Sequence, residues 1–246
     1  MKIANGIEML EIKANVMGRE SSINPVLIWD EENVILVDTG FPGQMKEINE
    51  AIESAGIDID RLNTIILTHQ DIDHIGSALS LVKNSENEIK VLCHEEEKKY
   101  IQGDETPVKL AKLEKSLSSM PNEMKGMYEK LKAGFSLSKV RVDKTLKDGE
   151  ELTFVGGTEV IYTPGHTPGH ICLYIKKNKV LIAGDLLTVN DGVLSKASPN
   201  INYDTNLSDK SLEKLKKYDI EKVICYHGGL YEKNVNERIS ELSREA

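Results

Sequence analysis

Short apolar runs, each bounded by polar residues, recur along the chain and alternate with stretches of helical periodicity. Runs of this kind are typical of buried strands. Gly156 and Gly157 separate two of them and predict a hairpin. The predicted strands are 7–12, 25–29, 34–37, 64–67, 90–93, 151–155, 159–162, 171–175, 180–183 and 222–225.

Apolar residues three and four positions apart predict helices between these strands. Met45, Ile48, Ile52 and Ala55 share one such face, and Gly56 follows them as a helix stop. The chain therefore forms two halves, each rich in strands and closed by helices. The other predicted helices are 75–84, one capped by Ser208 or Asp209 that carries Leu212 and Leu215, and one from about Val235.

The segment 103–147 has a different character, because it is rich in Lys, Glu, Ser and Met. Met120, Met124 and Met127 are spaced for one face of a helix, so we predict folded helices here rather than a linker. These methionines either pack on the body of the domain or offer an adaptable surface to an apolar substrate tail. The segment 186–205 contains Gly and Pro and is predicted to be irregular.

Four potential metal ligands directly follow the apolar run 64–67, namely His69, Asp71, Asp73 and His74. Carboxylates placed so close together repel each other, and a bound cation offsets that cost. Imidazole with carboxylate suits zinc, iron or manganese, whereas the lack of thiolate argues against a structural zinc knot. The alternative interpretation is a polar loop over a helix start.

This loop resembles the metal signature of the metallo-β-lactamase-fold hydrolases, usually His-x-His-x-Asp-His. The chain has His69-x-Asp71-x-Asp73-His74, so Asp71 stands in place of the second histidine. The extra carboxylate should weaken Lewis acidity and raise the pKa of a bound water. It also shifts the metal preference from zinc towards manganese or iron.

Later landmarks of that family follow in the same order. His166 lies in a Thr-Pro-Gly-His sequence, Asp185 in Ala-Gly-Asp, and His227 in Tyr-His-Gly-Gly. The resemblance covers nearly the whole chain and implies an α/β fold, the four-layer αββα sandwich of this family. It implies a single domain over residues 1–246 with a helical insertion at about 103–147, and such insertions commonly overhang the site.

Carried over residue by residue, the resemblance implies two divalent metal ions, zinc, manganese or iron. A water between two such ions loses a proton near neutral pH and becomes the nucleophile. Asp73 is also the predicted catalytic residue. The implied ligands are His69, Asp71 and His166 for one ion and Asp73, His74 and His227 for the other, with Asp185 bridging the two.

Four further residues lie around this signature but are not among the implied ligands. His170 shares the Thr-Pro-Gly-His sequence, but the resemblance makes it a buried structural histidine. Asp38 either supports the ligands from behind or only forms a turn. His94 is predicted at a solvated helix start beside a charged run. Gly76 would let the first turn of the next helix approach the metal closely.

The predicted reaction is hydrolysis of an ester, lactone, thioester or phosphodiester bond of a small molecule by a metal-bound hydroxide. One alternative is a di-iron redox protein related to the flavodiiron enzymes, although the chain shows no Gly-rich nucleotide loop. Another is a metal-bound sensor without turnover. The substrate would be selected by the segments 103–147 and 186–205, and residues 198–203 are candidates for the pocket mouth.

Composition narrows the partners of this 246-residue chain. Its net charge of −9 disfavours nucleic-acid and anionic-membrane surfaces, which need clustered Lys and Arg. Cys93, Cys172 and Cys225 lie in or beside apolar runs and suggest reduced structural thiols. The start of the chain lacks the apolar core of a signal peptide. We expect a cytoplasmic protein that acts on a small-molecule substrate, with no nucleic-acid or membrane partner.

Overall fold

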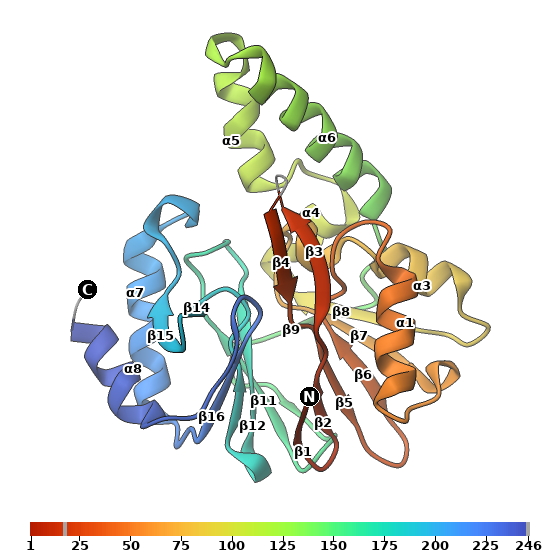
Figure 1. Ribbon diagram of the computed structural model, residues 1–246, viewed down its shortest axis with the longest axis vertical. Helices are drawn as coiled ribbons and strands as arrows, with labels where there is room; N and C mark the ends of the chain where they lie inside the picture. The colour runs from red at the N-terminus through yellow and green to blue at the C-terminus, as the bar shows by residue number, and fades with distance from the viewer. Residues whose placement is uncertain (17–18, 245–246) are drawn as a thin grey trace.

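The computed structural model describes residues 1–16 and 19–244, whose strands form two main sheets facing each other (Figure 1). The first sheet has the order β1 (Lys2–Ala4), β2 (Ile7–Met9), β5 (Val26–Trp29), β6 (Val34–Val37), β7 (Thr64–Leu67), β8 (Lys90–His94) and β9 (Lys144–Leu146). The second has the order β10 (Glu151–Leu152), β11 (Thr158–Tyr162), β12 (Ile171–Ile175), β13 (Val180–Ile182), β16 (Lys222–Cys225) and β17 (Gly229–Tyr231).

The strand β6 shows why these runs are apolar throughout. Side chains of a strand point alternately to its two faces. Ile35 and Val37 pack in the core between the two sheets, whereas Val34 and Leu36 pack in the core on the outer face of the first sheet. Because both faces are buried, no polar alternation remains in the sequence.

Helices cover the outer face of each sheet and complete four layers (Figure 1). Ile48 of α1 (Met45–Ser54) and Leu81 of α3 (Ala78–Asn84) pack over the first sheet. Leu212 of α7 (Thr205–Lys214) and Ile239 of α8 (Val235–Arg244) pack over the second. The predicted αββα sandwich is therefore confirmed. Among the described residues, no helix combines the length and apolarity needed to cross a bilayer.

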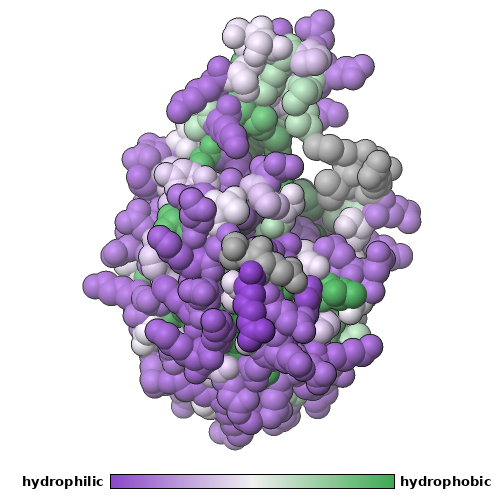
Figure 2. Space-filling view, turned by 90° about the vertical axis from the view of Figure 1, so that its left-hand side faces the viewer, coloured by the Kyte–Doolittle hydropathy of each residue, from purple (hydrophilic) through white to green (hydrophobic). Residues whose placement is uncertain are grey.

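A pair of helices, α5 (Val108–Ser116) and α6 (Asn122–Ser138), projects beyond the sandwich (Figure 1). Hydrophobic colours gather over this end, whereas the visible body is mostly hydrophilic (Figure 2). The helices predicted in this segment are present, but the three methionines do not share one helix face, because Met120 precedes α6. The 3-10 turn Leu117–Ser119 joins the two helices, and α4 (Glu95–Gln102) lies before them.

The predicted helix 75–84 is interrupted in the structure. A short α2 (Ile72–Ile75) is followed by a break at Gly76, after which α3 begins. A Cβ at Gly76 would lie 2.3 Å from Phe41 C and Pro42 N. Gly76 therefore allows close contact with the backbone of this neighbouring loop, directly after α2, which carries Asp73 and His74.

The segment 186–205 is more regular than predicted, because β14 (Leu187–Asn190) and β15 (Val193–Lys196) form a hairpin. Asp191 and Gly192 both have positive φ, 51° and 76°, which is the geometry of a two-residue hairpin turn. The cap of α7 also differs, since Asp204 accepts the Leu207 N–H at 3.0 Å and replaces Ser208 or Asp209 in that role. A further hairpin is formed by β3 (Ile12–Val16) and β4 (Arg19–Ile23).

Candidate metal centre

The predicted ligands lie on loops at one edge of the sandwich. β6 and β7 are parallel in the first sheet, as are β13 and β16 in the second. Loops that leave the carboxyl ends of such strands gather at a shared edge, where ligands commonly bind. The strands β6, β7, β11, β13 and β16 are followed there by Asp38, His69, His166, Asp185 and His227 respectively.

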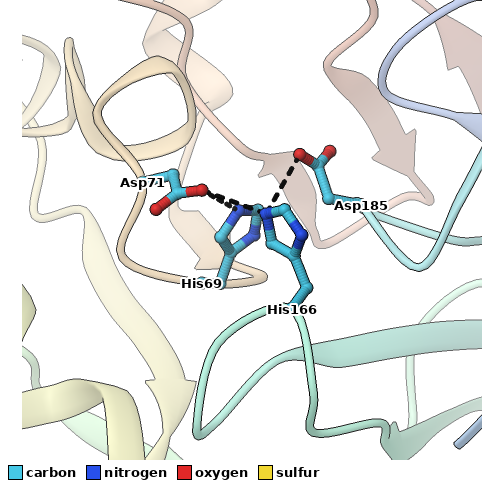
Figure 3. Close-up of side chains that lie close together, drawn as sticks. All are labelled: His69, Asp71, His166 and Asp185. Atoms are coloured by element: carbon cyan, nitrogen blue, oxygen red, sulfur yellow. Dashed lines mark hydrogen bonds and ion pairs between the residues drawn. The ribbon is translucent and has the colours of Figure 1, made fainter. Parts of the chain in front are cut away.

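The first group of ligand atoms belongs to His69, Asp71, His166 and Asp185, which all lie within 4.8 Å of one another (Figure 3). Asp71 Oδ2 is 3.3 Å from His69 Nε2 and 3.0 Å from His166 Nε2. Asp185 Oδ2 is 3.3 Å from His166 Nε2. All four residues are buried, so a cation between them would have protein atoms in place of most of its water.

The second group consists of Asp73, His74 and His227, again within 4.8 Å of one another. Asp73 Oδ2 lies 3.3 Å from His227 Nε2 and 3.8 Å from His74 Nε2. Asp185 joins the two groups, because its carboxylate also lies 3.3 Å from His74 Nε2 and 3.5 Å from His227 Nε2. The structure thus brings together all seven residues predicted as ligands.

Hydrogen bonds outside the site fix the tautomers of two histidines. Thr68 donates its hydroxyl proton to Asp38 at 2.8 Å, so His69 Nδ1, 2.9 Å away, must donate to Thr68. His74 Nδ1 donates to the same Asp38 carboxylate group, at 2.8 Å from Oδ2. Both rings therefore turn their Nε2 to the site, the nitrogen with which a histidine fixed at Nδ1 binds a metal.

Buried atoms without hydrogen bonds support the presence of a metal. The Nδ1 of His166 also has a partner behind the ring, because it lies 3.2 Å from Asn202 Oδ1, and the Nε2 of His166 faces the site. Among the described residues, His69 Nε2, His74 Nε2 and Asp185 Oδ1 are buried without a hydrogen-bond partner. Buried polar atoms normally have partners, and a set of imidazole and carboxylate donors suits a divalent ion. The residues present therefore fit the implied metals.

Asp38 takes the supporting role that the sequence left open. It lies at φ 62°, a conformation that Asp tolerates better than most residues. Its carboxylate accepts the Thr68 N–H at 2.8 Å in addition to the Thr68 hydroxyl and His74. Asp38 therefore orients His74 directly and His69 through Thr68.

His170 holds Asp185 in place from behind. Its Nε2 accepts the Asp185 backbone N–H at 3.0 Å, and its Nδ1 lies 2.9 Å from Thr163 Oγ1. Burial and the neighbouring His69 hold the pKa of His170 well below its usual value, so the ring is neutral. A Cβ at Gly184 would lie 2.5 Å from His170 Nε2, which explains the glycine before Asp185. His170 is thus structural, as the resemblance implied.

Two of the histidines carry protons that offset part of the carboxylate charge in the site. Burial and the neighbouring His74 lower the pKa of His69 to about 4. Burial would also lower the pKa of His74, but Asp185 and other carboxylates outweigh it and hold this pKa well above its usual value. Against burial, Asp185 likewise raises the pKa of His227 to about 10. Cations that enter the site would replace these protons.

Tyr226, which directly precedes His227, is a supporting residue that the sequence did not reveal. Its ring lies 3.8 Å from the His74 ring, and its hydroxyl donates to the Asp73 carbonyl. The same hydroxyl accepts the Gly40 N–H at 3.2 Å. Tyr226 therefore braces α2 from the opposite sheet, and only its place in the Tyr-His-Gly-Gly motif could have indicated it.

Glu97 is a second residue that the sequence did not identify. It is fully buried, although its charged neighbours predicted a solvated helix. Its carboxylate accepts from Thr167 Oγ1 at 2.7 Å, from the Gly169 N–H at 2.6 Å and from Gln70 Nε2 at 2.8 Å. Burial raises the pKa of Glu97 to about 7. Ile101 shares its buried helix face four residues later, which is the spacing that could have revealed it.

His94 begins α4, as predicted, but the prediction of a solvated position is wrong. The side chain is buried, and its Nδ1 accepts the Glu96 N–H at 3.3 Å. Its ring stacks on Tyr162 with ring centres 4.2 Å apart. The Tyr162 ring from the second sheet thus covers a histidine that the sequence alone places among charged residues.

The projecting helix α5 reaches the first ligand group. Lys109 Nζ forms an ion pair with Asp71 and lies 2.8 Å from His166 Nε2. The start of the helix is also attached, because Gln70 Oε1 accepts the Val108 N–H at 2.7 Å. Lys109 is one of many lysines in its segment, so no sequence signal distinguishes it.

A cavity of about 730 Å³ lies between α5 and the turn at residues 200–203, beside the first ligand group. Lys109 and Asn202 line it and also contact His166, so the cavity adjoins the ligands. Residues 198–203 were candidates for the pocket mouth, and 200–203 line this cavity. Among the described residues that line it, none is a methionine.

The chain is similar to known proteins of one family. The family described as the metallo-beta-lactamase superfamily matches residues 18–227. The uncharacterized protein YobT of Bacillus subtilis is 29% identical over 179 residues, which are 70% of this chain and 64% of that protein, so the chain spans less than two thirds of it. The hydroxyacylglutathione hydrolase GloC of Haemophilus influenzae is 27% identical over 213 residues, 83% of this chain and 85% of that protein.

The fold also matches solved structures. A metallo-beta-lactamase family protein from Thermus thermophilus superposes with a TM-score of 0.76 at 23% identity, covering 99% of this chain and 80% of that one. At this identity the likeness concerns the fold, and it agrees with the four layers described above.

Proposed function

The chain belongs to the metallo-β-lactamase superfamily, and we propose that it is a dinuclear metal-dependent hydrolase of a small-molecule ester, lactone, thioester or phosphodiester. One observation carries this proposal. Two groups of ligand atoms, each within 4.8 Å, are joined by Asp185 and lie beside a cavity large enough for a small molecule. A single ion cannot use all seven residues.

His69, Asp71 and His166 would hold one ion, Asp73, His74 and His227 the other, and Asp185 both. When bound, such ions supply Lewis acidity that activates water and polarises the oxygen of the scissile group. The protein contributes fixed Nε2 lone pairs, set by Asp38, Thr68 and Asn202 behind the ligands. These partners cost no reorganisation when substrate binds.

Asp73 keeps the predicted catalytic role in this proposal, as a general base. Its carboxylate is more accessible than that of Asp185, with side-chain exposures of 18% and 7%. Asp73 Oδ2, 3.3 Å from His227, can therefore take a proton from the attacking water and pass it to the leaving group.

A thiol nucleophile is disfavoured by the surroundings of the cysteines. In the described part of the chain all three are buried and free of disulfides. Burial raises the pKa of Cys172 to about 12 and that of Cys225 well above its usual value, so neither forms a thiolate readily. Free buried thiols support a reducing compartment, and we propose a cytoplasmic location on this ground.

The name of the Haemophilus relative, hydroxyacylglutathione hydrolase, favours the thioester among the candidate bonds. A di-iron redox function and a sensor role use the same ligand set. A redox protein would need an electron-donating partner, and a sensor would need no cavity beside the ions. We therefore favour hydrolysis over the redox function and the sensor role.

Metal reconstitution tests the proposal. Protein stripped with a chelator should be inactive, and reloading with zinc, manganese or ferrous iron should restore hydrolysis of at least one member of a panel of esters, lactones, thioesters and phosphodiesters. Elemental analysis should give two ions per chain, and Asp185→Asn should reduce this number. Two bound ions without turnover on the whole panel would contradict hydrolysis, and reversible electron uptake would favour the redox alternative.

A further inference from the structure

Lys109 lies at the border between the ligand groups and the cavity. Its side chain is 34% exposed, while its ammonium contacts both Asp71 and His166 of the first ligand group. An ammonium has no lone pair and cannot ligate a metal. The contact therefore cannot mean that Lys109 is an eighth ligand.

A cation held by Asp71 and His166 would repel this ammonium. The four-carbon stem of lysine is flexible, and the exposed part of Lys109 faces the cavity that it lines. The ammonium would therefore remain beside the ligand groups but turn towards the cavity. A positive charge would then stand at the inner end of the cavity, next to the reacting group of a bound substrate.

Two other residues that line the cavity are also positively charged. Lys112 and Lys115 also line it and follow Lys109 at intervals of three on the same helix, so the three lysines share one side of α5. This is unusual in a chain of net charge −9. The acidic residue of the lining, Glu105, is already paired with Lys99 at 3.1 Å.

The opposite wall adds two large apolar side chains that alternate with asparagines. Ile201 and Tyr203 are large hydrophobic residues that remain exposed, and both line the cavity. Leu113 adds a third apolar side chain from α5. Exposed apolar residues beside a basic row fit a ligand that has both an apolar part and an anionic group.

We propose that Lys109 anchors an anionic group of the substrate, and that the enzyme hydrolyses esters or thioesters carrying a carboxylate or phosphate on an apolar chain. This inference rests on the hydrolase function proposed above and specifies its substrate class. In the reaction, water adds to the acyl carbon, the bond to the leaving oxygen or sulfur breaks, and a proton from the water passes to the leaving group. Lys109 takes no part in these bond changes and acts by binding.

A matched pair of substrates tests the inference with metal-loaded protein. Mono-4-nitrophenyl adipate carries a carboxylate, and its methyl ester is neutral. Lys109→Met should raise the KM for the anionic ester about tenfold, corresponding to about 1.4 kcal/mol of binding. It should leave the KM for the methyl ester nearly unchanged, and Lys109→Arg should retain most of the preference for the anion.

Two further variants serve as comparisons. Lys112→Met should have a smaller effect in the same direction, because Lys112 lines the cavity without contacting the ligand groups. Lys130→Met removes the same charge from an exposed position on α6 outside this cavity and should leave both KM values unchanged. An equal loss with both esters in Lys109→Met would overturn the anchoring role.

Direct binding separates this inference from the hydrolase proposal. Hexanoate, hexyl phosphate and hexanol share an apolar chain, and calorimetry would give their dissociation constants for metal-loaded protein. We expect Lys109→Met to weaken one or both anions about tenfold and to leave hexanol unaffected. The stronger anion identifies the group. This result would stand even if no ester were cleaved, whereas unchanged anion binding would overturn the inference even in an active hydrolase.

Discussion

The strand-anchored ligand loops and the projecting α5–α6 pair meet at one centre but are built differently. Each predicted ligand follows a strand or lies in the turn after one, so the two sheets fix its position. The helix pair projects beyond the sandwich and reaches the centre through Val108 and Lys109. We infer that the first region determines which ions bind and the second which molecules reach them.

Burial and hydrogen bonding distinguish the two regions further. His69 and His74 are fully buried, and each has a hydrogen-bonded partner behind its ring. Lys109 is one-third exposed on a long flexible side chain. A rigid first region preserves the geometry needed for chemistry, while an adaptable second region tolerates change in the substrate.

The largest effects are expected from alanine substitutions of His166 and His170 in the rigid region, and the two variants should differ from each other. His166→Ala removes a predicted ligand whose ring contacts Asn202 and Lys109 outside the ligand set. It should remain folded, lose metal and lose nearly all activity. His170→Ala instead leaves the buried Asp185 N–H without a partner and removes the ring that lies 2.9 Å from the Thr163 hydroxyl. It should lower the free energy of unfolding by about 1–3 kcal/mol and retain metal.

Metal content and chemical unfolding of both variants would test this contrast, and each variant is the control for the other. The reverse pattern, with His170→Ala metal-free and His166→Ala destabilised, would exchange their assignments. Equal loss of stability in both would show that the rigid region depends on bound metal for its folding.

The ligand edge was predictable because its information is local. Four candidates within six residues point to the site without knowledge of the fold, and the later motifs of three or four residues do so through the family resemblance. Apolar runs likewise predicted most strands, since strands buried on both faces show no other pattern. The β14–β15 hairpin was missed although Asp191-Gly192 is a typical turn sequence, because Pro199 and a polar composition dominated the interpretation.

Other features depend on contacts between distant segments and leave no local signal. The carboxylate of Glu97 looks solvated in sequence, yet it accepts from the Thr167 and Gly169 loop about 70 residues away. Lys109 reaches His166 across 57 positions. Only the packing of distant segments creates these contacts, so the spacing of Glu97 and Ile101 could have indicated that Glu97 is buried but not what it binds.

Glu97 links the two regions, and Glu97→Gln should loosen this link. Thr167 and Gly169 both bond Oε1, so the amide oxygen can replace that atom, but the amide nitrogen would then face the Gln70 nitrogen. Gln70 must turn and lose its bond to the Val108 N–H. Hydrogen exchange at Val108 should become faster, while β7 remains protected. Unchanged exchange at Val108 would show that Gln70 does not hold the start of α5.

The same substitution should change the pH dependence of stability. The pKa of Glu97 is raised to about 7 in the folded protein from 4.5, so its contribution to stability is complete below about pH 4.5 and lost as the pH rises through about 7. This loss amounts to about 3 kcal/mol at most. The amide introduced by Glu97→Gln cannot titrate. The free energy of unfolding of this variant should therefore change less between pH 5 and 8 than that of the wild type. If the free energy of unfolding of the variant fell as steeply with pH as that of the wild type, other groups would be responsible for the pH dependence.

The smallest expected effect comes from Asp71→His, which alters the point where the regions touch. Asp71, Asp73 and Asp185 carry −3 against +4 from two divalent ions, and the substitution leaves −2. The higher net charge should move metal preference towards zinc and lower the pH at which activity rises, by about one unit at most.

The substitution also removes the carboxylate that pairs with Lys109. Residues in contact have non-additive effects, so Lys109→Met should change anion binding by a different factor in Asp71→His than in the wild type. Metal competition, a pH profile and the four-protein comparison would measure this together. Full additivity would mean that Lys109 acts on the substrate independently of Asp71, and an unchanged pH profile with unchanged metal preference would refute the charge argument.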